Sequence, residues 1–151
     1  MDNERKSKGM LRFLLVLTFT WTALNIIAYS SMAMMLPAFK ETYNSTPGLF
    51  PEEMKTMMDM FLALPRSYFA VGTLLFALEM TGGVLMWRLR PAGFHCYTIA
   101  RLLMLLVPVL FIGRDYLMLG DAMFAALYIT AYWLLMKSNG VFKGEKNQSE
   151  Q

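Results

Sequence analysis

The sequence contains one cysteine, Cys96, and one histidine, His95. A single cysteine excludes an intramolecular disulfide, and it leaves thiol relays and cysteine-cluster metal sites without the second thiol that they need. A single histidine excludes a haem held by two histidines of one chain. The two residues are also neighbours, so in a helix their side chains point about 100° apart, which is poor geometry for a pair of ligands. No cofactor is therefore expected.

Charge is scarce as well, because Asp, Glu, Lys and Arg make up only 17% of the 151 residues. Hydrophobic residues make up 56%, the mean hydropathy is +0.40, and the apolar residues fall in long blocks. This pattern is typical of an integral membrane protein. The net charge of +3 comes from tails and loops. The expected partner is therefore the lipid bilayer, and nucleic acid is not expected.

Four apolar runs are each long enough to cross a bilayer, which takes about 20 helical residues. The sequence predicts an all-α integral membrane four-helix bundle, with a tail over 1–9, a membrane domain over 10–136 and a second tail over 137–151. Pro37 is expected to end the first span and to open an outer loop over 37–67. The expected spans cover about 10–36, 68–87, 94–112 and 116–136.

The first run also admits a second interpretation, a signal peptide cleaved near the small residues at 31–33. The apolar region of a signal peptide is only about 7–15 residues long, which favours a retained span.

The outer loop contains a short amphipathic segment between Pro51 and Pro65. Proline suits the start of a helix, and the apolar side chains after it recur at helical spacing. We expect an extracytoplasmic helix lying on the bilayer or capping the bundle. Met54, Met57 and Met58 lie on it, and thioethers are soft ligands that select Cu(I). Methionine is also an adaptable apolar filler, and the chain has 15 of them, which favours the packing interpretation.

The distribution of basic residues predicts the orientation. The terminal side carries nine of them and the other side four, and the positive-inside rule then places both termini in the cytoplasm. The nine are Arg5, Lys6, Lys8, Arg12, Arg88, Arg90, Lys137, Lys143 and Lys146, and the four are Lys40, Lys55, Arg66 and Arg114.

Two charged residues lie inside predicted spans, Glu79 in the second and Arg101 in the third. Both lie roughly 10–14 Å above the inner surface at 1.5 Å per helical residue, and the two spans are adjacent and antiparallel. Because an isolated charge at such depth costs at least about 2.5–3.5 kcal/mol, we expect an intramembrane ion pair that fixes the register of the two spans. The alternatives are a protonated Glu79, since burial disfavours a charged carboxyl, or a site for a substrate or a proton.

A second polar level is expected nearer the outer surface. Asn25, Thr73 and Asp121 lie at similar heights in three spans, roughly 22–24 Å up. Hydrogen bonds between helices are the simpler interpretation, and Asp121 is expected to lie near Arg114. An outward-facing polar vestibule is the alternative. Trp21, near mid-membrane, is expected to pack inward.

Small residues predict where the spans approach one another closely. They are Gly72, Gly82 and Gly83 in the second span and Ala122, Ala125 and Ala126 in the fourth.

The stretch RLRPAGFHCYTIARLLMLLVPVLF resembles small bacterial four-span membrane proteins of unassigned function. A basic turn is followed there by Gly93-Phe94, Tyr97 and Val107-Pro108. The resemblance implies a bacterial inner-membrane protein, and it brings no catalytic residues. The layout is also similar to claudin-type proteins, but the outer loop lacks their cysteine pair and tryptophan. The Cys-x-x-Cys of quinone-linked thiol-redox proteins is absent too.

The sequence favours a multi-pass membrane protein with a structural or accessory role, and not an enzyme, since no catalytic triad, metal cluster or phosphate loop is present. Its further partners are expected to be copies of itself or another membrane protein. One alternative is a small oligomeric transporter or channel that uses Glu79 and Arg101. The other is an extracytoplasmic Cu(I)-binding protein that uses the loop methionines.

Overall fold

The computed structural model describes residues 2–46, 51–113 and 119–143, and all the regular secondary structure in these ranges is helical. Four of the helices are long and apolar enough to cross a membrane, as the sequence predicted. They are α1 (Asp2–Ser45), α3 (Arg66–Trp87), α4 (Pro91–Phe111) and α5 (Leu119–Ser138). The remaining elements are the short helix α2 (Glu52–Ala63) and the 3-10 helix η2 (Val141–Lys143).

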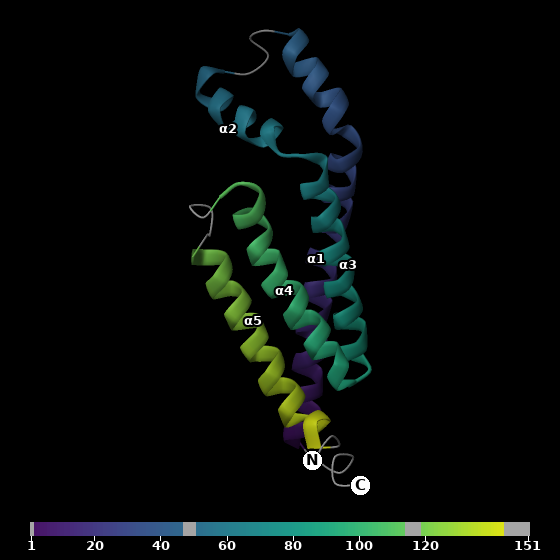
Figure 1. Ribbon diagram of the computed structural model, residues 1–151. Helices are drawn as coiled ribbons and strands as arrows, with labels where there is room; N and C mark the ends of the chain where they lie inside the picture. Colours follow the sequence, from purple (N-terminus) through teal and green to yellow (C-terminus); the bar gives the residue numbers. More distant parts are fainter. Residues whose placement is uncertain (1, 47–50, 114–118, 144–151) are drawn as a thin grey trace.

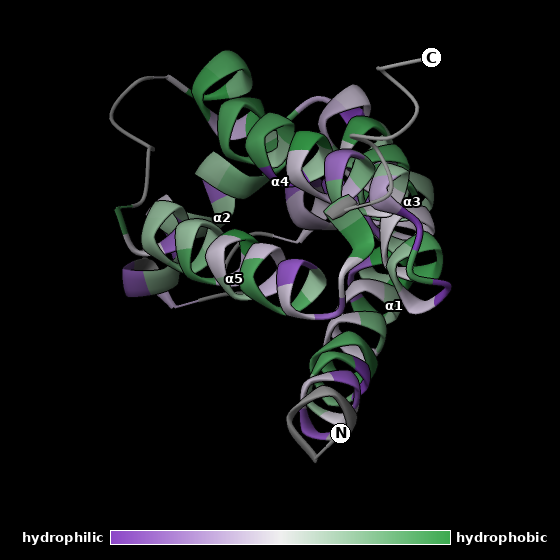
Figure 2. Ribbon diagram, turned by 90° about the horizontal axis from the view of Figure 1, so that it is seen from below, coloured by the Kyte–Doolittle hydropathy of each residue, from purple (hydrophilic) through white to green (hydrophobic). Residues whose placement is uncertain are grey.

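The four long helices run roughly along one direction, and α3 packs closely against both α1 and α4 (Figure 1). Helix α5 touches α1 and α4 over shorter stretches. The outer faces of α4 and α5 are largely hydrophobic (Figure 2). Leu110 on α4 is 78% exposed and Leu127 on α5 is 63% exposed. Such faces suit contact with lipid chains.

The close approach of α3 and α4 depends on two glycines. A Cβ atom on Gly82 would lie 2.6 Å from the backbone nitrogen of Tyr97, and one on Gly93 would lie 2.7 Å from the carbonyl oxygen of Gly82. The two backbones therefore touch where these glycines face each other. Gly72 and Gly83 make room for the rings of Tyr29 and Phe19 on α1, so all three glycines expected to allow close packing do so.

Two apolar clusters lie at opposite ends of the molecule. The terminal cluster joins α1, α3, α4 and α5 and comprises Leu11, Leu15, Met86, Tyr97, Tyr132 and Met136. Beside it, the Asn139 amide donates a hydrogen bond of 3.0 Å to the Ser7 hydroxyl. The outer cluster comprises Leu36, Leu62 and Phe69. It fastens α2 across the other end (Figure 1).

Helix α1 is longer than predicted at both ends. It includes residues 2–9, which we expected to form a tail, and it continues through Pro37 to Ser45. A proline inside a helix removes one backbone hydrogen bond and costs about 3 kcal/mol. Packing on both sides of Pro37 offsets this cost. Leu36 is buried in the outer cluster, and the Tyr43 hydroxyl donates a 2.8 Å hydrogen bond to Asp59 of α2.

The turn between α3 and α4 is shorter than predicted. Pro91 and Gly93 were expected in the turn, but α4 begins at Pro91. Proline suits this first position, since its missing N–H would have no partner there, and Gly93 serves packing. The turn contains Leu89 in the left-handed region, at φ 55°.

The short helix α2 follows Pro51 and ends before Pro65, as the sequence predicted. The start of the fourth span was placed at residue 116, and residues 116–118 lie outside the described residues.

A candidate ligand-binding cavity

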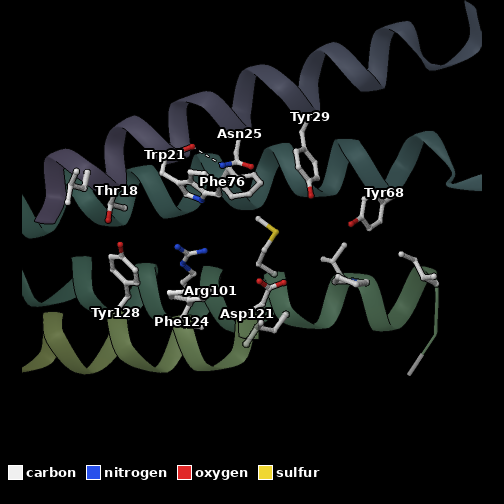
Figure 3. A pocket seen from close by; sticks show the side chains of 17 residues that line it. Thr18, Trp21, Asn25, Tyr29, Tyr68, Phe76, Arg101, Asp121, Phe124 and Tyr128 are labelled. Atoms are coloured by element: carbon white, nitrogen blue, oxygen red, sulfur yellow. Dashed lines mark hydrogen bonds between the residues drawn. The ribbon is translucent and has the colours of Figure 1, made fainter. Parts of the chain in front are cut away.

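A cavity of about 620 Å³ lies between the long helices. Along α1 it extends from Leu17 to Tyr29, between Leu15 of the terminal cluster and Leu36 of the outer cluster. Its walls are mainly apolar, with several polar groups among them, and α1 faces α4 and α5 across it (Figure 3). Helix α3 contributes Tyr68 and Phe76. Concave sites that bind small molecules have this size and this composition.

Arg101 lies in the wall of this cavity, and Glu79 lies behind it. The Nε atom of Arg101 is 3.2 Å from Oε1 of Glu79. The Glu79 side chain is 1% exposed, whereas that of Arg101 is 20% exposed. The distance is that of an ion pair, and it brings together the two charges that the sequence placed at matched depth.

The contact between Glu79 and Arg101 is a charge attraction without an aligned hydrogen bond. The single Nε–H of Arg101 is directed at the hydroxyl of Tyr97, at 3.4 Å. Neither carboxylate oxygen of Glu79 accepts a hydrogen bond of good geometry from the part of the chain that the structure describes, although the buried hydroxyl of Thr22 on α1 lies close to this carboxyl group. The 3.2 Å contact still stabilises both charges, because Coulomb attraction does not require alignment.

Two members of the terminal cluster, Tyr97 and Tyr132, link Arg101 to other helices. Both are fully buried, and their rings meet edge to face with centroids 4.9 Å apart. The Tyr132 hydroxyl shares a hydrogen bond of 2.6 Å with Thr18 of α1. The Arg101 side chain is thus supported by residues on several helices, which fixes its position at the cavity wall.

Two of the three residues of the expected second polar level line the cavity. Asn25 and Asp121 face each other across it (Figure 3). The Asn25 amide donates to the carbonyl oxygen of Trp21 at 2.8 Å. Thr73 is not among the lining residues, and its hydroxyl donates to the Phe69 carbonyl oxygen at 2.9 Å. The expected neighbour of Asp121, Arg114, lies outside the described residues.

We expected Trp21 to pack inward, but it does not lie in a core. Its side chain is 58% exposed and lines the cavity. Residues deep in a span can remain exposed in this protein because α1 and α5 do not meet along this part of the molecule (Figure 3).

Sequence reasoning missed the cavity as a whole, although a signal was present. The α1 residues that line it include Thr18, Trp21, Asn25 and Tyr29, which recur at steps of three or four and so share one helix face. The α5 residues Asp121, Ala125 and Tyr128 follow the same spacing. These polar and aromatic stripes lie opposite Arg101, Met104, Leu105 and Pro108 on α4. They could have marked the faces that meet there, but not whether a cavity or a closed interface forms between them.

The loop methionines do not share one surface. Met58 packs against the outer cluster, whereas Met54 is 47% exposed and Met57 is 71% exposed. No group of three His, Cys, Asp or Glu side chains suited to a metal ion occurs among the described residues.

The cavity combines six aromatic side chains with one guanidinium and one carboxylate. The six are Trp21, Tyr29, Tyr68, Phe76, Phe124 and Tyr128. Such a site can bind a molecule that has both apolar and polar parts. Comparison of the chain with protein families, with curated proteins and with solved structures returns no match in any of the three.

Proposed function

We propose that the chain is a membrane-embedded binding protein with an accessory, non-enzymatic role, which holds a small amphipathic molecule between its helices. The observation that carries the proposal is the cavity of about 620 Å³ with the Arg101 guanidinium in its wall. An apolar cavity of this size within the spans takes up hydrophobic molecules, since packing alone leaves few voids larger than a water molecule. The guanidinium adds donors that orient an acceptor group of the ligand.

In this proposal Glu79 lowers the free-energy cost of placing the Arg101 guanidinium inside the membrane. A guanidinium at this depth is costly unless a counter-charge lies close, and Glu79, which is not part of the cavity lining, lies 3.2 Å away. The pair thus has a structural role and a binding role together. Glu79 offsets the charge, and Arg101 still presents its outer N–H groups to a ligand.

We further propose that the four long helices form a bundle in a bacterial inner membrane, with both termini in the cytoplasm and α2 on the outer side. The excess of basic residues at the terminal side supports this orientation. The hydrogen bonds between α1 and the segment after α5 support a shared side for the two ends of the chain.

The test is to fill the cavity and to ask whether the protein loses a bound molecule. Ala125 is 4% exposed and lines the cavity, whereas Leu127, two residues further along α5, is 63% exposed and does not line it. We expect native mass spectrometry in mild detergent to show a retained small molecule on the wild type and on Leu127→Phe, and to show it lost from Ala125→Phe.

Because Ala125 is buried and Leu127 is exposed, the thermal midpoint of each variant is measured as well, and only a folded Ala125→Phe protein that has lost the molecule supports the proposal. Equal retention by Ala125→Phe and the wild type, or a wild type that retains nothing from native membranes, would contradict the proposed function.

A further inference from the structure

The charges that face the cavity identify a ligand class, provided that the proposed binding function holds. We propose that the ligand is a zwitterionic phospholipid of the ethanolamine type, with its phosphate at Arg101, its ammonium group at Asp121 and its acyl chains leaving between α1 and α5.

Arg101 supplies the anion end of the site. Its Nε–H is directed at Tyr97 and its charge is offset by Glu79, and no Nη hydrogen bond to a described residue is found. The guanidinium points into the space between α4 and α1 (Figure 3). Two unused N–H pairs in a planar fork match a phosphate, which accepts two hydrogen bonds at once.

Asp121 supplies the cation end. It lies in the first turn of α5, its side chain is exposed, and no basic group among the described residues pairs with it. Asn25 lies across the cavity, with its amide nitrogen bonded to Trp21, so its oxygen is the atom left to accept. The rings of Tyr29 and Tyr68 lie further along the same side (Figure 3). Carboxylate, amide oxygen and aromatic faces together favour an ammonium group.

A ligand of one charge would satisfy only half of the site. An anion at Arg101 would share the cavity with the carboxylate of Asp121, which has no basic partner among the described residues, and a simple cation at Asp121 would share it with the guanidinium. In a site of low dielectric both arrangements are unfavourable. A head group that carries phosphate and ammonium places an opposite charge beside each residue.

The cavity wall points to a lipid as the source of this head group. Leu17 and Trp21 on α1 and Phe124 on α5 are 46%, 58% and 62% exposed, and all three line the cavity. An exposed apolar surface on both sides of the space between α1 and α5 suits acyl chains. A water-soluble zwitterion would occupy the polar part of the cavity but would not fill the apolar space beside these side chains.

The experiment uses Trp21 as the reporter. Trp87 and Trp133, which do not line the cavity, are changed to phenylalanine in the full-length chain. The protein is reconstituted in phosphatidylcholine vesicles that contain a low, equal fraction of one lipid with brominated acyl chains: phosphatidylethanolamine, phosphatidylglycerol or phosphatidylcholine. Bromine quenches tryptophan on contact, so the degree of quenching reports which lipid occupies the cavity.

We expect brominated phosphatidylethanolamine to quench Trp21 most strongly. Asp121→Asn should lower its apparent preference about tenfold, because one charge-assisted interaction is lost. Glu53→Gln removes a carboxylate on the exposed surface of α2 and should leave the preference unchanged. Equal quenching by the three lipids, or a preference that survives Asp121→Asn, would overturn the proposal. Displacement of the brominated lipid by water-soluble glycerophosphoethanolamine would overturn the lipid source.

A further variant separates this proposal from the proposed function. If Ala125→Phe lowers quenching by all three lipids equally, and the wild type shows no preference, the cavity binds lipid but not by its head group. If Ala125→Phe changes quenching by none of them, the cavity is not the binding site, and both proposals fail.

Discussion

Arg101 is the residue at which the packing of the helices meets the surface of the cavity. Its aliphatic part and its Nε atom belong to the interior, beside Glu79 and Tyr97, while its outer nitrogens face the cavity. A change at this position therefore acts on stability and on binding together. Glu79 is buried and lies outside the cavity lining, so a change there acts on stability directly and on binding only through Arg101.

We expect the effects of changing Glu79 and Arg101 on stability to depend on each other. Glu79→Gln or Arg101→Gln leaves one charge buried without its partner, and breaking a buried pair costs about 3–5 kcal/mol. The loss should be smaller here, since Arg101 is partly exposed. The double variant Glu79→Gln/Arg101→Gln should recover much of the stability that each single variant loses. Membrane abundance and the thermal unfolding temperature in detergent would measure the stability of each variant.

The comparison of the single and double variants can also contradict the proposed pairing. If both single variants unfold at the wild-type temperature, the two charges do not need each other, and the role given to Glu79 is wrong. Glu53→Gln on the exposed face of α2 is the matched control for the loss of a carboxylate.

Among the elements, α3 and α4 approach each other backbone to backbone, and this contact depends on Gly82. We expect Gly82→Ala to separate the two helices, because the new methyl group would lie 2.6 Å from the Tyr97 backbone nitrogen. Overpacking of this kind costs about 1–3 kcal/mol. The thermal midpoint in detergent should fall accordingly. Arg101 is one helical turn after Tyr97, so lipid binding should weaken as well.

Gly120→Ala provides the comparison for that prediction. Gly120 lies in the first turn of α5, and a Cβ there would have nothing within 4 Å. Alanine favours a helix over glycine by up to about 1 kcal/mol, so this variant should be as stable as the wild type or more so. A drop in stability equal to that of Gly82→Ala would contradict the steric argument.

The elements also show what could be predicted from the sequence. Hydropathy identified four spans, and the two prolines around α2 marked its limits. Matched depth predicted that Glu79 and Arg101 would approach each other. Helix ends were less predictable. Pro37 and Gly93 are turn residues by local preference, but contacts with α2 and α3 place them inside helices.

The cavity could not be predicted from the sequence pattern, for a physical reason. It exists because α5 packs against α1 only near the terminal cluster, and the distance between two helices is a property of their packing, not of either sequence pattern. A polar and aromatic stripe such as Thr18, Trp21 and Asn25 is equally compatible with a closed interface.

For the whole molecule the orientation can be tested directly. We expect a fluorescent protein fused after the C-terminus to fluoresce in a bacterial host, and alkaline phosphatase fused there to be inactive, because phosphatase requires the oxidising outer compartment. The same two reporters inserted at residue 46, after α1, should give the opposite result. Phosphatase activity at the C-terminus would reverse the predicted orientation.

The terminal cluster closes the cavity on the side of the chain ends, so the space between the helices does not continue to that side. A molecule that enters between α1 and α5, as we propose, comes from the hydrocarbon phase. Occupancy then follows the concentration of the molecule in the membrane, and its partition coefficient becomes part of the apparent affinity. Each methylene added to a ligand contributes about 0.8 kcal/mol to that partition before any contact with the protein is made. Affinities of a homologous series therefore have meaning only when expressed per mole of lipid.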